Sequence, residues 1–201
     1  MSAWKDNKNY KEVTIMIFEV DKAILLWIKE YLRNDVLTPV LRLVTSLGNA
    51  GIIWIVLTII LLLYQPTRKL GVLCLLALVG EFIVCNVLIK NIVKRARPYT
   101  KIEGLNPLVK KPTDYSFPSG HSSSSFAVGF TIFRKADKRW GIPALILATL
   151  ISLSRLYVAV HYPSDVVVGI IIGIAFSYIG EWLLKRFEKN SDLKETNQVN
   201  E

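Results

Sequence analysis

Phe117-Pro118-Ser119-Gly120-His121 separates a basic, proline-containing loop from an apolar segment, and the rest of the chain is arranged around it. One polar cluster, around Arg97, precedes this stretch, and another, around His161, follows it. The chain has 2 histidines, His121 and His161, and both fall inside these clusters. The remaining segments are long and apolar, which predicts a membrane scaffold that brings the three clusters together.

The composition is that of a polytopic membrane protein. Apolar residues make up 52% of the 201 residues, and the mean hydropathy is +0.38. The net charge of +9 lies largely in short loops, where Lys and Arg set topology and meet lipid headgroups. No basic stripe with interleaved aromatic residues appears, so we expect membrane and lipid partners, no nucleic acid and no obligate protein partner.

The apolar runs predict an all-α fold, a polytopic transmembrane helical bundle of about six spans in a single domain, residues 1–201. Five spans are expected at 51–64 (beginning upstream near Thr45), 70–93, 119–133, 140–160 and 166–184. The segment 13–32 carries several charges and is either an interfacial helix or a first span. Residues 1–12 and 186–201 are polar ends.

The charge of the loops predicts the orientation in the membrane. One side carries ten cations: Arg68, Lys69, Arg134, Lys135, Lys138, Arg139, Lys185, Arg186, Lys189 and Lys194. The long loop on the other side carries five beyond the motif residues: Lys94, Arg95, Lys101, Lys110 and Lys111. Cytoplasmic loops are enriched in Lys and Arg, so we expect a plasma-membrane protein whose polar clusters face the extracytoplasmic side.

The first cluster pairs two cations at the end of the expected helix 70–93. Lys90 and Arg97 lie two helical turns apart, on nearly one face and ~10 Å apart along the axis. Arg97 precedes a proline and is therefore expected just past the helix end. A guanidinium fork beside a compact ammonium suits an anion with several oxygens, although cations that flank a membrane also meet headgroups.

The second cluster opens the next expected helix. Ser119 can cap this helix, and Gly120 lets the backbone approach a ligand closely. Free amide groups at a helix start bind phosphate, and His121 is then held beside an anion site. The simpler alternative is a capping serine next to an incidental interfacial histidine.

The third cluster straddles the turn between the last two expected spans. Arg155 sits in an apolar helix, where an unpaired cation is costly and needs a partner or a function. Ser164 is expected to cap the last helix, with Asp165 in its first turn. Asp165 could accept a hydrogen bond from one nitrogen of His161 and leave the other free as a nucleophile, or it could only favour its own helix N-terminus.

Together the clusters resemble the type-2 phosphatidic acid phosphatase superfamily. All three motifs of that family are present in order across residues 90–165: Lys90 with Arg97-Pro98, Pro118-Ser119-Gly120-His121, and Ser154-Arg155 with His161 and Asp165. The resemblance implies an integral-membrane lipid phosphate phosphatase of the phosphatidylglycerophosphatase or undecaprenyl diphosphatase type.

The resemblance also implies a role for each motif residue. His161 would attack phosphorus and form a phosphohistidine, with Asp165 orienting it, and His121 would protonate the leaving oxygen and then activate water. The phosphoryl oxygens would be held by Lys90, Arg97, Ser119, Gly120 and Arg155. The family works without a metal or other cofactor, and no Asp/Glu/His cluster with metal-ligand spacing appears in the sequence.

The motifs leave the lipid open, since they bind only the phosphoryl group. A glycerophospholipid such as phosphatidylglycerophosphate or phosphatidic acid is slightly favoured, and undecaprenyl diphosphate is the enzymatic alternative. A non-catalytic anion-binding membrane protein or transporter on the same fold is the alternative from another class. Glu81, deep in the helix that carries Lys90, is predicted to be a buried polar link between helices, and a role in a substrate channel is the alternative.

Overall fold

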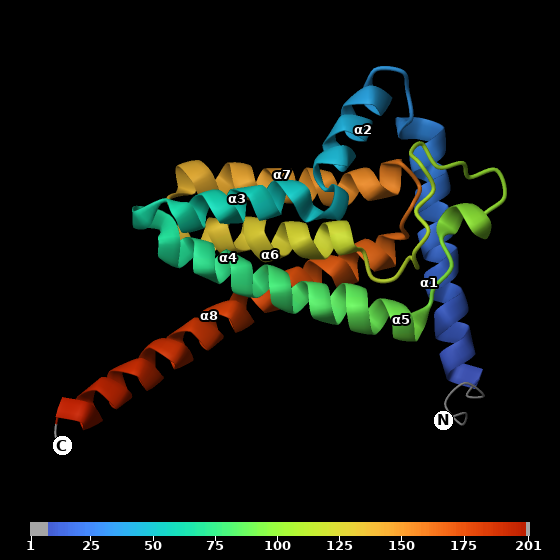
Figure 1. The fold of residues 1–201 in the computed structure, drawn as a ribbon. Helices are drawn as coiled ribbons and strands as arrows, with labels where there is room; N and C mark the ends of the chain where they lie inside the picture. The colour runs from blue at the N-terminus through green and yellow to red at the C-terminus, as the bar shows by residue number, and fades with distance from the viewer. Residues whose placement is uncertain (1–7, 200–201) are drawn as a thin grey trace.

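The helices α3 to α8 run alongside one another as a bundle, and α1 crosses one end of it (Figure 1). This computed structural model describes residues 8–199, and their side chains from residue 12 to residue 190. Over these residues the structure is helical, without a strand. In chain order the elements are α1 (Lys8–Trp27), η1 (Ile28–Leu32), α2 (Leu37–Leu47), η2 (Asn49–Gly51), α3 (Ile52–Leu63), η3 (Gln65–Thr67), α4 (Arg68–Glu81), η4 (Phe82–Ile89), α5 (Lys90–Val93), η5 (Pro98–Thr100), α6 (Gly120–Lys135), α7 (Lys138–Tyr157) and α8 (Pro163–Val199).

Helix α6 forms the centre of the bundle, packed against α4, α7 and α8. Of its 16 residues, 10 are buried, among them the serine run 122–125. Small side chains let its neighbours approach closely. A Cβ added at Gly173 of α8 would lie 2.5 Å from the carbonyl oxygen of Ser123, and one added at Gly169 would lie 2.6 Å from that of Ser119. The helix that carries His121 is thereby fixed on several sides.

The expected span 51–64 is broken near its start. Helices α2 and α3 meet at an angle of 45°. Ala50 and Gly51 bridge them with left-handed φ values of 50° and 67°. Gly48 packs so closely that an added Cβ would lie 2.7 Å from a carbon of His121 and from one of Ile151. The kink therefore delivers the segment 48–51 to the start of α6.

Among the described residues, three helices are long and apolar enough to cross a membrane: Gln65–Thr100, Lys138–Tyr157 and Pro163–Asn190. The bent pair α2–α3 makes a fourth if it is counted as one span. Helix α6 has 16 residues, about 24 Å at the standard rise, and is enclosed by its neighbours. The five helical segments expected as spans are therefore present, running side by side.

For residues 13–32 the sequence left an interfacial helix and a first span open, and the direction of helix α1 favours the interfacial helix. It runs across the bundle rather than along it (Figure 1). It buries Asp21 and Leu25 against the bundle, as η1 buries Ile28, whereas Val20 and Trp27 are exposed. An amphipathic helix of this kind can lie in the headgroup region of a membrane.

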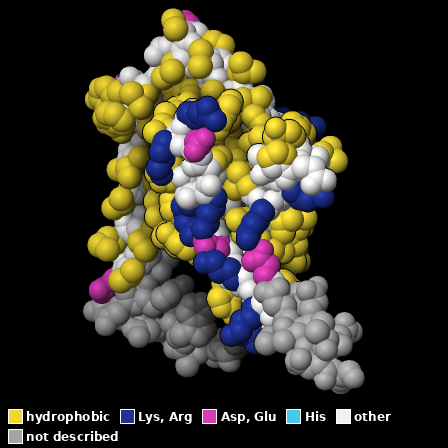
Figure 2. All heavy atoms as spheres, turned by 90° about the vertical axis from the view of Figure 1, so that its left-hand side faces the viewer, with side chains coloured by type: hydrophobic (Ala, Val, Ile, Leu, Met, Phe, Trp, Pro, Cys, Tyr) yellow, Lys and Arg dark blue, Asp and Glu magenta, His cyan; other side chains and the backbone are white. Residues whose placement is uncertain are grey.

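The opposite end of the bundle is basic. Figure 2 shows Lys and Arg side chains gathered there, bordered by apolar side chains. Arg134 and Lys135 hold Glu181 of α8 at 2.5 and 2.6 Å, and Lys69 pairs with Glu188 at 2.9 Å. Helix α8 continues to Val199, so much of the polar C-terminal segment is helical; residues 1–7, at the other end of the chain, lie outside the described part.

Candidate active site

Lys90 and Arg97 converge as the sequence predicts, and a carboxylate lies between them. Lys90 Nζ is 2.6 Å from Asp114 Oδ2, and Arg97 Nη2 is 2.6 Å from Asp114 Oδ1. Burial alone would raise the pKa of Asp114, but hydrogen bonds and charges from Lys90 and Arg97 lower it to about 2. Asp114 is therefore ionised at neutral pH, and its two oxygens occupy donors that suit a phosphoryl group.

Arg97 also touches the nucleophile candidate. The chain leaves α5 at Lys94 with a left-handed φ of 51°, and Arg97 follows in extended conformation, past the helix end as expected. Arg97 Nη1 donates to the carbonyl of Val160 at 2.7 Å and lies 3.4 Å from His161 Nε2. The same guanidinium thus connects Asp114 to His161.

The start of α6 carries the second motif in the expected way. Ser119 is the N-cap, and its hydroxyl accepts from the amide of Ser122 at 3.4 Å. A Cβ at Gly120 would lie 2.6 Å from Asn86 Oδ1, so this position has no room for a side chain. His121 Nε2 lies 3.2 Å from Asn49 Oδ1, which the kink between α2 and α3 supplies.

Arg155 has a partner and a spare donor. It is buried in the last turn of α7, where Nη1 donates to Thr45 Oγ1 at 2.6 Å. Its Nε has no hydrogen-bond partner within the described part of the chain. A buried guanidinium with an open N–H, in a wall of the cavity, is suited to an anionic ligand.

His161 and Asp165 face each other, as the spacing predicts. His161 Nδ1 lies 3.5 Å from Asp165 Oδ2, at the limit of a hydrogen bond, and has no other partner among the described residues. Burial, opposed by Asp165 and assisted by Arg97 and Arg155, lowers the pKa of His161 to about 4. At neutral pH the imidazole is uncharged, which a nitrogen nucleophile requires.

The expectation that Ser164 caps the last helix is wrong. Helix α8 begins at Pro163, which suits a first helical position because its ring presets φ and its missing N–H leaves no donor unsatisfied. Ser164 is therefore already in the first turn. Its amide and hydroxyl instead donate to Asp21 of α1, at 2.9 and 2.5 Å. Asp165 lies in the first turn as expected.

Glu81 forms the predicted link between helices. It is buried in α4, and its Oε2 accepts a hydrogen bond from Ser123 Oγ of α6 at 2.5 Å. Between Glu81 and Lys90 in the sequence lies Asn86, whose Oδ1 accepts a hydrogen bond from Lys90 Nζ at 3.3 Å. The link ties the helix of Lys90 to the helix of His121.

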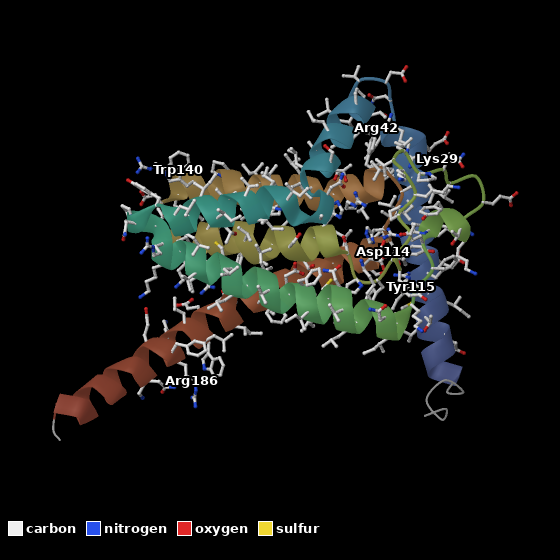
Figure 3. The ribbon with its side chains drawn as sticks, viewed as in Figure 1. Lys29, Arg42, Asp114, Tyr115, Trp140 and Arg186 are labelled. Carbon is white, nitrogen blue, oxygen red and sulfur yellow. The ribbon has the colours of Figure 1, made fainter. Side chains whose placement is uncertain are left out.

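One cavity of about 840 Å³ joins these groups. Its polar wall contains Lys90, Arg97, His121, Arg155 and His161. Asp114 lies at this end of the bundle and Trp140 at the other (Figure 3). Another wall of the cavity is apolar and lies between α3 and the helix formed by α4 and η4, lined by Ile55, Ile59, Leu62, Leu75, Leu78, Val79 and Phe82.

Sequence reasoning missed several residues that shape the site. Asp114, Asn86, Asn49 and Thr45 each contact a motif residue. Asn86 could have been found because it precedes Lys90 by one helical turn. Asn49 and Thr45 lie far from the motifs in sequence, and only the kink between α2 and α3 brings them there.

Comparison with known proteins identifies a family and several relatives of this chain. The chain matches the PAP2 superfamily over residues 69–189. An undecaprenyl-diphosphatase of Sulfolobus acidocaldarius is 35% identical over 127 residues, 63% of this chain and 61% of the relative's length. Phosphatidylglycerophosphatase B of Bacillus subtilis is 29% identical, covering 85% of each chain. The crystal structure of a transmembrane PAP2-type phosphatidylglycerolphosphate phosphatase from Bacillus subtilis superposes with a TM-score of 0.69 at 26% identity, covering 92% of this chain and 90% of that one.

Proposed function

Because the chain belongs to the PAP2 superfamily, we propose that it is an integral-membrane lipid phosphate phosphatase. The observation that carries the proposal is the single cavity, in which three cations and two histidines form one wall and apolar side chains of α3 and α4 form another. A phosphorylated headgroup matches the first wall, and the start of a lipid tail matches the second. The chain spans 61% of the length of the Sulfolobus relative.

The proposed reaction has two steps. His161 Nε2 attacks phosphorus, a P–N bond forms, and the bond from phosphorus to the lipid oxygen breaks as His121 donates a proton to that oxygen. Water then attacks phosphorus, His121 takes a proton from it, and the P–N bond breaks to release inorganic phosphate. Lys90, Arg97, Arg155 and the start of α6 at Ser119–Gly120 would stabilise the charge on the phosphoryl oxygens.

These cations supply the charge that a metal would otherwise provide, so we expect no metal requirement. Phosphate release should persist in excess EDTA, and vanadate, which can mimic pentacoordinate phosphorus, should inhibit it. Loss of activity in EDTA with recovery on adding Mg²⁺ would contradict the cation-only site.

The choice of lipid is supported by a second group of cations. Arg42 of α2 and the loop residues Lys110 and Lys111 line the exposed side of the same cavity. A headgroup with two phosphates would engage both groups. This favours phosphatidylglycerophosphate or a prenyl diphosphate, the classes named for the two relatives above, over phosphatidic acid.

A panel of lipids in mixed micelles tests both the phosphatase activity and the preference for a headgroup with two phosphates. Phosphate release from phosphatidylglycerophosphate, undecaprenyl diphosphate and phosphatidic acid is compared for the wild type and for Lys110→Gln/Lys111→Gln. We expect the double variant to raise KM about fivefold, and only for the lipids with two phosphates. A change of this size is what the loss of solvent-exposed ion pairs with the second phosphate would cause. Lys101→Gln, in the same loop but outside the cavity, is the control. No release from any lipid, with retained vanadate binding, would favour the non-catalytic anion binder or transporter.

The active site is proposed to face the extracytoplasmic side of the plasma membrane. The ten cations of the opposite end support this orientation, and Lys29 of η1 is among the cations at the site end (Figure 3). In a Cys74→Ala, Cys85→Ala background, a cysteine replacing Asn106 should react with an impermeant maleimide in intact cells. A cysteine replacing Asp137 should react only after permeabilisation, and the reverse pattern would place the site inside.

A further inference from the structure

Arg95 lies outside the cavity, on the side of Asp165 that faces away from His161. It belongs to the same loop as Arg97, two residues earlier, yet it contacts different carboxylates. Its Nη1 lies 2.6 Å from Asp165 Oδ1, and its Nη2 lies 2.8 Å from Asp21 Oδ2. The guanidinium carbon also sits 3.9 Å from the centroid of the Tyr162 ring. Arg95 is thus held by two acids and an aromatic face, and it does not line the cavity.

Asp21 reaches this position from α1. It is buried, on the same helix face as Leu25 and Ile28. Besides Arg95, its oxygens accept the amide and the hydroxyl of Ser164, the residue before Asp165. Helix α1 precedes the region that matches the family, which begins at residue 69. A contact to the catalytic turn therefore comes from a part of the chain that lies outside the family match.

The contacts of Asp165 divide between its two oxygens. Oδ2 accepts from Ser116 Oγ at 2.5 Å and from the amide of Tyr162 at 2.9 Å, and it faces His161 Nδ1. Oδ1 is held by Arg95. Removing Arg95 would leave one oxygen of a fully buried carboxylate without its donor, and the carboxylate could then rotate away from His161.

We propose that Arg95 and Asp21 are positioning residues for the phosphohistidine reaction, acting through Asp165 to hold His161 in its attacking orientation. In this arrangement α1 is part of the catalytic unit as well as a membrane contact. This role rests on the proposed phosphatase function. The orientation and tautomer of the His161 ring can nevertheless be measured without turnover. Neither residue touches the substrate.

The kinetic test separates positioning from phosphate binding. In Arg95→Gln we expect kcat to fall about ten- to a hundredfold, the range seen when outer-shell partners of active-site ligands are removed. KM and the inhibition constant of inorganic phosphate should stay unchanged, because the cavity cations remain. Arg95→Lys, which keeps the charge, should recover part of kcat. Asp21→Asn should lower kcat less, and the double variant Asp21→Asn/Arg95→Gln should fall no further than Arg95→Gln alone.

A spectroscopic test needs no activity. With 2 histidines in the chain, ¹⁵N-histidine labelling gives two pairs of ring-nitrogen signals, Nδ1 and Nε2 of each imidazole, and His121→Gln assigns the pairs. We expect the wild-type His161 ring to carry its proton on Nδ1, and the Arg95→Gln and Asp21→Asn variants to shift this tautomer balance. The His121 signals should not move.

Arg33→Gln is the matched control. Arg33 donates to the carbonyls of Tyr157 and Asn106 at the same end of the bundle, so its loss should lower thermal stability without changing kcat or the His161 ring signals. An unchanged His161 tautomer in Arg95→Gln, or an equal kcat loss in Arg33→Gln, would overturn the inference. Absence of turnover in the wild type together with the expected ring shifts would instead contradict the proposed function alone.

Discussion

Two carboxylates are connected to His161: the front one, Asp114, through the guanidinium of Arg97, and the rear one, Asp165, by facing Nδ1 directly. Asp114 stands in the cavity, with its side chain 50% exposed, and bridges Lys90 and Arg97. Asp165 is 0% exposed and contacts Arg95, Ser116 and the amide of Tyr162. Both are ion-paired to cations from the same stretch of chain, which ends α5 and enters the long loop.

The difference in burial indicates a difference in role. A half-exposed carboxylate can exchange its cations for water or for another anion at small free-energy cost. A fully buried carboxylate cannot, since leaving its partners unpaired costs several kcal/mol. The front carboxylate is therefore suited to be displaced by a phosphoryl group, and the rear one to stay fixed while the reaction proceeds.

The largest expected effect comes from the rear carboxylate and the imidazole it faces. His161→Ala should abolish turnover with the fold intact, because among the described residues that line the cavity no other imidazole takes the place of His161. Asp165→Asn should lower kcat by ~10⁴-fold, as in other systems where a carboxylate orients a histidine. Circular dichroism and gel filtration in detergent check folding, and phosphate release measures kcat.

Full activity in His161→Ala would remove the assigned nucleophile. A loss in Asp165→Asn no larger than that in Asp114→Asn would mean that the burial contrast does not separate the two roles.

The sequence predicted the rear pair better than the front one. His161 and Asp165 are four residues apart across a turn, so local geometry alone brings them together. Asp114 lies 24 residues after Lys90 in a long loop, and nothing local fixes where such a loop folds back. The same reason explains Asn49 and Thr45, which depend on a kink between α2 and α3.

Asp21 is an intermediate case. The spacing of Leu25 and Ile28 predicts a buried face on the N-terminal helix, and an acid on that face needs a partner. The sequence therefore contained a signal for Asp21, but it could not identify Arg95 as the partner. The fold class and the main helical segments were predictable because hydrophobic runs act locally, whereas the break between α2 and α3 and the angle of α1 to the bundle depend on tertiary packing.

The second expected effect is the pH dependence of kcat/KM, which tests how burial and neighbouring charges shift the pKa of His161. The pKa of His161 is lowered to about 4, mainly by burial, with Asp165 opposing the shift. The neutral, nucleophilic form is thus present above pH 4 and is lost as pH falls through that value. We expect the acidic limb of kcat/KM near pH 4 rather than near 6.5.

Removing the rear charge should move this limb in a defined direction. The negative charge of Asp165 favours the imidazolium form, so Asp165→Asn should shift the limb of the residual activity to lower pH. A limb near pH 6.5 in the wild type would indicate that His161 is more solvated than its burial implies.

The smallest effect is expected at the front carboxylate. Asp114 lies 2.6 Å from Lys90 and from Arg97, and its low pKa keeps it charged across the working range. An incoming phosphoryl group must compete with it for the same donors. Asp114→Asn removes the competing charge but keeps an oxygen that can accept a hydrogen bond. We expect the inhibition constant of inorganic phosphate to fall about fivefold, equivalent to ~1 kcal/mol, with a similar decrease in KM.

Glu103→Gln provides the matched control, because it removes the same charge from the same loop without contacting Lys90 or Arg97. It should leave both constants unchanged. Weaker phosphate inhibition in Asp114→Asn would reverse the assignment: the carboxylate would then hold Lys90 and Arg97 in place for the substrate rather than compete with it. Since the donors are shared, the direction of this change distinguishes the two roles even where its size is small.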